Sequence, residues 1–254
     1  MTVAPHPHFT DRYANADEKR QYLRSIFDDT AVDYDRVESW LALGSGKWYR
    51  RQALLRAGLK PGMRVCDVAC GTGLVAREAL AIVGGSAETV TGSVLGVDPS
   101  QGMLQQATSA LPKLASAIGR AESIPAQDNS FEFLSMGYAL RHVEDLSLAF
   151  AEYHRVLKPG GTVCILEITS PDSRVRRFFM KAYMRLISGV FCRLPRVLGG
   201  SRSARTSDLW HYYWDTIDQC VRPQSVLDAL RAAGFTNVKR GVQLGVFSEY
   251  TGTK

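Results

Sequence analysis

The sequence has few cysteines and no long apolar run. No stretch of its 254 residues approaches the roughly eighteen apolar residues of a membrane-spanning helix, and the first residues show no apolar core of a signal peptide. The five cysteines are an odd set without a Cys-x-x-Cys pair, and no His/Cys/Asp/Glu cluster has metal-ligand spacing. These absences argue against a zinc or redox site and predict a cytoplasmic, reduced protein without a metal.

Acidic residues are missing from one segment, residues 173–205, which holds nine Lys or Arg side chains. The net charge is +6, but outside this segment 22 basic residues face 25 acidic ones. Apolar residues of the segment fall on one helical stripe, and several cations fall near the other face. The pattern predicts a basic amphipathic helix that contacts an anionic membrane at its inner face, a lid over an active site, or both. Nucleic acid is disfavoured as a partner, because the aromatics share the apolar face.

Residues 65–73 and 94–98 form a pattern typical of nucleoside binding. Each is an apolar strand that ends near a carboxylate, and a glycine turn follows the first. Gly71 and Gly73 lack Cβ, so the turn can be tight and its backbone can approach a ligand. Asp98 would accept hydrogen bonds from both ribose hydroxyls, since a carboxylate only accepts.

The choice of nucleoside depends on Asp67. Ala76 is tolerated in the looser dinucleotide fingerprint, so glycines alone do not exclude NAD. A carboxylate beside the loop would repel a pyrophosphate and attract an ammonium group. S-Adenosylmethionine carries an ammonium and a sulfonium but no phosphate, and is favoured as the cofactor. A glycine turn in some other α/β protein remains the alternative.

The rest of the chain predicts alternating strands and helices. Expected strands are 64–68, one that ends at Asp98, 131–137 and 162–168; expected helices are 22–55 with a break at 44–46, 72–83, 99–110, 145–157 and 223–233. A hairpin around Gly241 should close the chain. We expect a flexible segment at 1–20 and a single domain at 21–254, with lid insertions at about 21–55 and 172–220. Alternation of this kind predicts an α/β fold with a mostly parallel sheet and an antiparallel hairpin at its edge.

Four motifs resemble class I S-adenosylmethionine-dependent methyltransferases: residues 67–73, 96–104, 121–125 and 155–161. Three others, 27–35, 138–143 and 166–171, resemble more narrowly the ubiquinone/menaquinone biosynthesis C-methyltransferases. The resemblance implies a Rossmann-like, seven-stranded sheet with a helical lid. Its cofactor residues would be Asp67, Ala69, Gly71, Thr72, Gly73, Asp98, Pro99, Met103, Ala121, Glu122 and Gly137. Arg120 stands where the family usually has Asn or Asp, so the adenine contact would fall to Ala121 or Glu122.

The resemblance also implies the residues that act on the acceptor. Arg141 matches an arginine at the end of the fourth strand, and because arginine stays protonated it would stabilise a phenolate. His142 replaces the family's usual Asn and is either a general base or a polar loop residue. Tyr34 matches a tyrosine of the N-terminal lid. Gly137, in place of Ser, and the aromatic cluster at 210–214 would reshape the acceptor pocket.

These features favour methyl transfer from S-adenosylmethionine to a hydrophobic small molecule, a quinol-like or phenolic ring methylated on carbon. One alternative is an O- or N-methyltransferase of another lipid or secondary metabolite. A remote alternative is a non-catalytic scaffold that binds the cofactor. A homodimer is left open.

Overall fold

The computed structural model describes residues 3–6, 15, 17–28, 45–84, 92–171, 173–183, 185 and 215–254. The predictions for Tyr34 and for the aromatic cluster at 210–214 lie outside the described residues. The same holds for most of the basic segment beyond residue 185.

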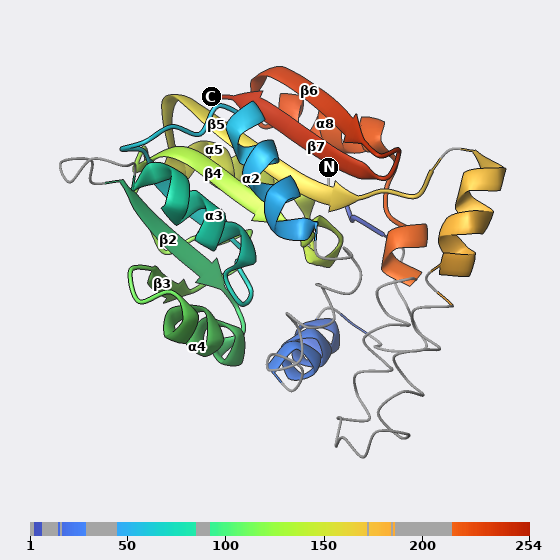
Figure 1. The fold of residues 1–254 in the computed structure, drawn as a ribbon, viewed down its shortest axis with the longest axis horizontal. Coiled ribbons are helices and arrows are strands. Elements are labelled where there is room, and N and C mark those ends of the chain that lie inside the picture. Colours follow the sequence, from blue (N-terminus) through green and yellow to red (C-terminus); the bar gives the residue numbers. More distant parts are fainter. Residues whose placement is uncertain are drawn as a thin grey trace.

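A seven-stranded sheet forms the centre of the molecule (Figure 1). In chain order its strands are β1 (Arg64–Val68), β2 (Ser93–Asp98), β3 (Ala115–Ile118), β4 (Phe131–Gly137), β5 (Leu157–Ile168), β6 (Thr236–Gln243) and β7 (Phe247–Thr253). Their spatial order is β3-β2-β1-β4-β5-β7-β6; the first five are parallel, and β7 pairs antiparallel with both β5 and β6. The predicted fold class is confirmed.

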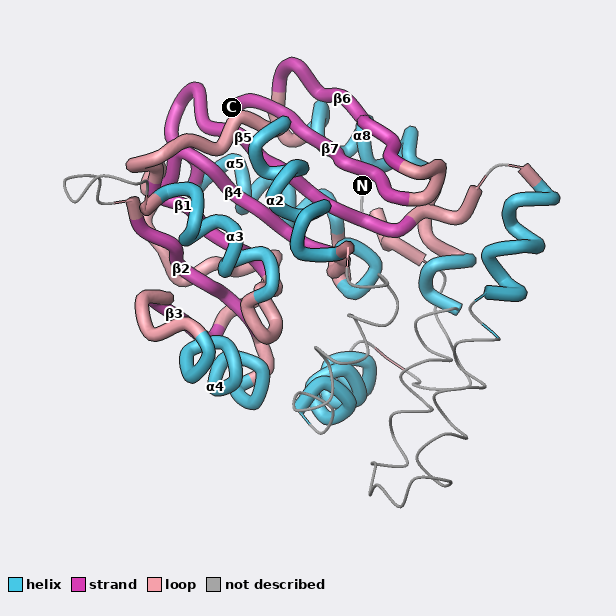
Figure 2. Tube along the Cα trace, viewed as in Figure 1, coloured by secondary structure: helices cyan, strands magenta, loops and turns pink. Residues whose placement is uncertain are grey.

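Helices cover both faces of this sheet. They include α2 (Gly46–Arg56), α3 (Leu74–Val83), α4 (Gln101–Ala110), the short 3-10 helix η1 (Leu140–His142), α5 (Leu146–Val156) and α8 (Pro223–Ala232). Helical turns also span residues 17–28, 174–183 and 215–218. Figure 1 places α2 and α3 in front of the sheet and α5 and α8 behind it, and Figure 2 shows the same layers by element type.

The two faces have separate cores, which explains why the central strands are nearly all apolar. In β1, Val65 packs into the core with α2 and α3, while Cys66 and Val68 pack into the core with α5 and α8. This alternation follows the two-residue period of a strand. It places Asp67 on the α3 side, directly below the glycine turn.

Three boundaries differ clearly from the predictions. The fifth strand begins at Leu157, not at residue 162. The hairpin turns at Leu244 and Gly245, which both take positive φ, and Gly241 lies within β6 without positive φ. The first helix begins at residue 17, where the Asn15 side chain accepts a hydrogen bond from the Glu18 backbone N–H at 2.9 Å.

Residues 3–6, expected to be frayed, are held by long-range backbone hydrogen bonds. The Leu146 N–H donates to the Val3 carbonyl at 2.9 Å, and the Val221 N–H donates to the Pro5 carbonyl at 2.7 Å. The first described residues therefore pack against the body of the domain.

The carboxyl ends of β1, β2 and β4 meet at one edge of the sheet, where the strand order reverses between β1 and β4. The helix over residues 17–28 lies opposite this edge (Figure 1). Within the described ranges, no helix has both the length and the apolar character needed to cross a bilayer.

Candidate active site

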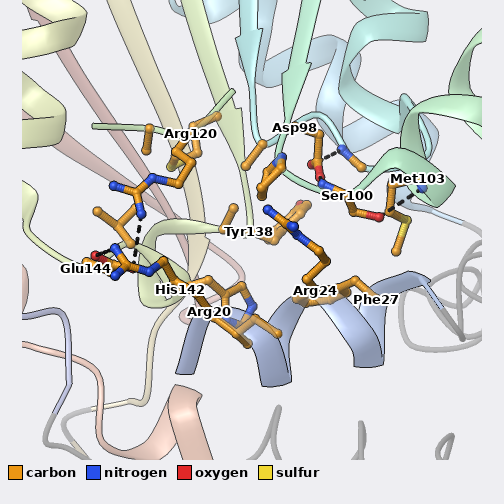
Figure 3. Close-up of a pocket in the computed structure, with 18 of the residues that line it drawn as sticks. Arg20, Arg24, Phe27, Asp98, Ser100, Met103, Arg120, Tyr138, His142 and Glu144 are labelled. Atoms are coloured by element: carbon orange, nitrogen blue, oxygen red, sulfur yellow. Dashed lines mark hydrogen bonds and ion pairs between the residues drawn. The ribbon is translucent and has the colours of Figure 1, made fainter. Parts of the chain in front are cut away.

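A cavity lies at the carboxyl ends of β1, β2 and β4, under the helix at 17–28 (Figure 3). Its empty volume is about 980 Å³, counted out to its open mouth. Its lining residues are Arg20, Leu23, Arg24, Phe27, Ala69, Gly71, Asp98, Pro99, Ser100, Met103, Arg120, Ala121, Glu122, Met136, Gly137, Tyr138, Ala139, His142, Val143 and Glu144.

Asp98 is fixed at the floor of this cavity. Its Oδ2 accepts the Gly71 N–H at 2.9 Å, and its Oδ1 accepts the Ser100 N–H at 2.8 Å. Each oxygen keeps a lone pair for a ligand hydroxyl. Burial raises the pKa of Asp98 to about 6, although the two backbone hydrogen bonds oppose the rise. The carboxylate is thus pre-oriented toward the cavity and suits a ribose diol.

The glycine turn exposes backbone to the same space. Ala69 and Gly71 both have positive φ, and a Cβ added at Gly71 would meet nothing within 4 Å. That open space gives a nucleoside room beside the backbone. Gly73 is different, because its Cβ would lie 2.8 Å from Cδ1 of Leu111; this glycine lets the turn pack against the end of α4. Gly73 and the buried Thr72 do not line the cavity.

Asp67 lies beneath the turn and does not line the cavity. Its Oδ1 accepts the Ser135 hydroxyl at 2.7 Å, and burial raises its pKa to about 7. Ser135 lies on β4, so this carboxyl ties β1 to β4 behind the glycine turn. A direct contact between Asp67 and the cofactor's ammonium group stays a prediction.

Charged residues gather where the adenine is expected. Arg120 Nη1 lies 3.4 Å from Glu144 Oε1, and Glu122 Oε1 accepts the Glu144 N–H at 2.7 Å. Met103 and Ala121 line the neighbouring wall. The Arg120 side chain is therefore held at the rim by Glu144, in place of the family's Asn or Asp.

The end of β4 carries a strained turn. Tyr138 has φ of 60°, and its N–H donates to the Leu166 carbonyl at 2.7 Å. At Gly137, a Cβ would lie 2.5 Å from Cγ2 of Val75. Val75 of α3 therefore occupies the space that a side chain at position 137 would need.

Arg141 and His142 are adjacent in η1 but have different environments. Arg141 Nη1 lies 2.5 Å from Glu167 Oε1 in a buried ion pair that does not line the cavity. His142 does line the cavity, and its ring packs edge-on against Phe27, with centroids 5.3 Å apart. The pKa of His142 is held well below its usual range. Burial is the main cause, and the positive charge of Arg141 is the second. Its imidazole is neutral near pH 7.

Four lid residues that face the cavity from the helix at 17–28 were not among the predicted site residues. They are Arg20, Leu23, Arg24 and Phe27. Their spacing of i, i+3, i+4 and i+7 places them on one helical face, and this pattern was the available signal. Tyr138 was also missed, since nothing in its local sequence indicates positive φ.

Taken together, a parallel sheet with an antiparallel β7, a glycine turn after β1 and an acid at the end of β2 define a nucleoside-dependent transferase fold. Two solved structures share it: a SAM-dependent methyltransferase from Thermotoga maritima (TM-score 0.61, 22% identity, 91% of this chain and 99% of that one) and one from Mesorhizobium loti (TM-score 0.55, 20% identity, 83% and 99%).

The sequence comparisons identify the family. The family model "ubiE/COQ5 methyltransferase family" matches residues 15–254, so the chain belongs to that family and is an S-adenosylmethionine-dependent methyltransferase. The demethylmenaquinone methyltransferase of Symbiobacterium thermophilum is 31% identical over 249 residues, 94% of each chain. The enzyme of the same name from Staphylococcus saprophyticus is 28% identical over 240 residues, 93% of this chain and 97% of that one.

Proposed function

We propose that the protein methylates a ring carbon of a hydrophobic quinol, the type of acceptor that the name of its relatives, demethylmenaquinone methyltransferase, describes. The observation that carries this proposal is the position of His142. Its neutral imidazole faces the same cavity as Asp98, between apolar walls that include Leu23 and Phe27. A base beside the cofactor site, in an apolar chamber, suits a phenolic ring.

When bound, the cofactor supplies a methyl group on a sulfonium, which is a good leaving group. The protein has to position the acceptor and raise the nucleophilicity of its ring carbon. In our proposal the phenol O–H proton passes to a ring nitrogen of His142. The electron-rich ring carbon takes the methyl group as the methyl–sulfur bond breaks. That carbon then loses its own proton to water, which restores the aromatic ring, and the phenolate oxygen takes its proton back from His142.

Arg141 supports this chemistry from behind His142 in our proposal. Its guanidinium is held by Glu167, and its positive charge is one of the causes that lower the pKa of His142. A neighbouring cation keeps the imidazole unprotonated near pH 7 but lowers its basicity, and it favours a phenolate nearby. The predicted role of Tyr34 in the lid stays a prediction.

The first test is methyl transfer from labelled S-adenosylmethionine to demethylmenaquinol, demethylubiquinol and simple phenols. We expect ring C-methylation of the quinols, established from the product's mass and the methyl position. Exclusive O-methylation would contradict the proposal and favour the alternative enzyme class, because a phenolate oxygen is itself a nucleophile. No transfer despite tight cofactor binding would favour the scaffold.

The second test separates His142 as a base from a structural role. His142→Ala should lower kcat by about 100-fold or more at saturating cofactor, the usual contribution of a general base. His142→Asn restores the family's usual residue, which is polar but cannot accept the proton in the same way. If His142→Ala keeps wild-type kcat, the base lies elsewhere.

We further propose that helix 174–183 contacts an anionic membrane, from which a lipid-like acceptor would enter. Val175, Phe178 and Phe179 are each exposed, by 64%, 68% and 65% respectively. Exposed cations lie at other positions of the same helix: Arg174, Arg176, Arg177 and Lys181. The mixture suits a lipid surface, whose acyl chains take the aromatics and whose headgroups take the cations.

The hairpin turn extends this surface. A Cβ at Gly245 would lie 3.5 Å from Nη1 of Arg176, so the β6–β7 turn lies beside the helix. Leu244, at the tip of that turn, is 86% exposed. Arg177 anchors the helix to the body, since it lies 2.8 Å from Asp218.

A further inference from the structure

The helix at 17–28 is attached to α4 through its last described residue, Asp28. Asp28 Oδ1 accepts the Ser100 hydroxyl at 2.5 Å and the Gly102 N–H at 3.1 Å. Ser100 is also the N-cap of α4, and its Oγ accepts the Met103 N–H at 3.0 Å. Asp28 thus satisfies an N–H group of the first turn of α4, and its negative charge suits the positive end of that helix.

Gly102 makes this close approach possible. A Cβ at position 102 would lie 3.0 Å from Oδ1 and 3.3 Å from Cα of Asp28. Rotating the Asp28 side chain would relieve only the first contact, so the backbone of the helix would also have to move. A glycine inside a helix is unfavourable relative to alanine, and here it accommodates the lid.

The same contact reaches the cofactor site. The Ser100 backbone N–H donates to Asp98, while the Ser100 hydroxyl donates to Asp28. Ser100 therefore joins the lid to the predicted ribose acceptor within one residue.

A second attachment lies near the other end of the helix. Arg20 Nη1 lies 3.3 Å from Glu144 Oε2, on the opposite side of the cavity mouth (Figure 3). Between the two attachments, Leu23, Arg24 and Phe27 line the cavity. The helix thus crosses the mouth of the cavity and contacts the body of the domain near both of its ends.

We propose that Asp28 is a positioning residue, and that its contact with Ser100 and Gly102 holds the helix at 17–28 closed over the cofactor and sets the rate of cofactor release. The contacts of Asp28 lie on the cofactor side, at Ser100, whose backbone N–H donates to Asp98. Asp28 accepts two hydrogen bonds at the start of α4, whereas Arg20 reaches Glu144 through one contact of 3.3 Å, so we assign closure to Asp28.

The test uses S-adenosylhomocysteine as the probe and measures its dissociation rate by chase with unlabelled ligand. Asp28→Ala and Gly102→Ala should each release it about tenfold faster than wild type. Asp28→Asn keeps an oxygen acceptor for both donors and should restore slow release in part. Gln21→Ala, an exposed position on the same helix, is the matched control and should release at the wild-type rate.

Thermal stability separates positioning from a general structural role. Alanine is the better helix former, so Gly102→Ala should keep or raise the melting temperature while it accelerates release. Hydrogen exchange over 17–28 should slow on ligand binding in wild type but not in Asp28→Ala. Wild-type release rates in Asp28→Ala and Gly102→Ala would overturn the proposal, and so would faster release with a matching fall in melting temperature. Failure of wild type to bind the probe would instead contradict the cofactor assignment.

Discussion

At the scale of single residues, Asp98 combines ligand recognition with a shifted pKa. We expect Asp98→Ala to weaken S-adenosylmethionine binding by about 2 kcal/mol, or about 30-fold, because charge-assisted hydrogen bonds to the ribose are lost. The affinity of wild type should also fall as the pH drops through about 6, where the carboxylate becomes protonated and loses acceptor capacity. Calorimetry between pH 5 and 8 measures both effects.

The control is Asp98→Asn, whose amide cannot titrate. Its affinity should be lower than that of wild type at pH 8 and flat as the pH is lowered. A fall with a midpoint near 7 that persists in this variant would assign the titration to Asp67, whose pKa is raised to about 7.

The raised pKa of Asp98 has the opposite effect on the stability of the ligand-free protein, which should gain from mild acid. The pKa of Asp98 is raised in the folded state, from 3.8 to about 6, so the buried charge destabilises the fold above about pH 6. That penalty disappears as the pH falls from about 6 toward 4. Mild acid should therefore relieve this one unfavourable contribution to folding while it weakens cofactor binding.

At the scale of secondary-structure elements, the Arg141–Glu167 pair joins η1 to β5. Both side chains are at most 4% exposed. Arg141→Ala would leave Glu167 charged and buried, so we expect a loss of about 3–5 kcal/mol in the free energy of unfolding. Arg141→Ala combined with Glu167→Gln leaves no buried charge and should recover much of that loss in urea denaturation.

The double variant also makes the catalytic role of Arg141 measurable in a folded protein. If the guanidinium favours a phenolate, kcat should stay low in the double variant while cofactor affinity remains near normal. Equal stability of Arg141→Ala and the double variant would contradict the assignment of the loss to an unpaired, buried Glu167. Wild-type turnover in the double variant would remove Arg141 from the mechanism.

The local sequence was enough to predict those site residues whose position depends only on the strand that carries them. The glycine turn and Asp98 lie at the ends of apolar strands, so their placement at one edge of the sheet follows from the strand pattern alone. The inward or outward direction of each side chain depends on distant partners. Asp67 does not line the cavity, and its Oδ1 accepts the hydroxyl of Ser135, 68 positions later. Gly73 packs against Leu111, which no pattern within the turn could indicate.

The hairpin illustrates the same limit. Gly241 and Gly245 are both plausible turn residues in the sequence, and only strand pairing distinguishes them. Gly241 pairs with Glu249 across the sheet, so it lies within β6. For the helix at 17–28, the helical spacing could be read from the sequence, but its contact with α4 could not.

At the scale of the whole molecule, charge and exposed apolar surface coincide on helix 174–183. We expect binding to anionic vesicles that falls with added salt, and that drops about tenfold or more when Phe178 and Phe179 are both changed to Ala. Leu148→Ala, on α5 and 59% exposed in wild type, is the matched control and should bind as wild type does. Vesicle co-sedimentation measures all three proteins. Equal binding to neutral and anionic vesicles at low salt would leave the lid as the only role for this helix.

The insertion of β7 between β5 and β6 has a consequence for how the chain folds. Paired residues of β1, β2 and β3 lie 20 to 29 positions apart, whereas those of β5 and β7 lie 79 to 91 positions apart. Closing the longer loop costs more entropy, so the pairing of β1 with β2 should form earlier. In pulse-labelled refolding, we expect amides that link β1 to β2 to gain protection before those that link β5 to β7. The ribose-binding half would then be assembled while the other edge of the sheet is still open.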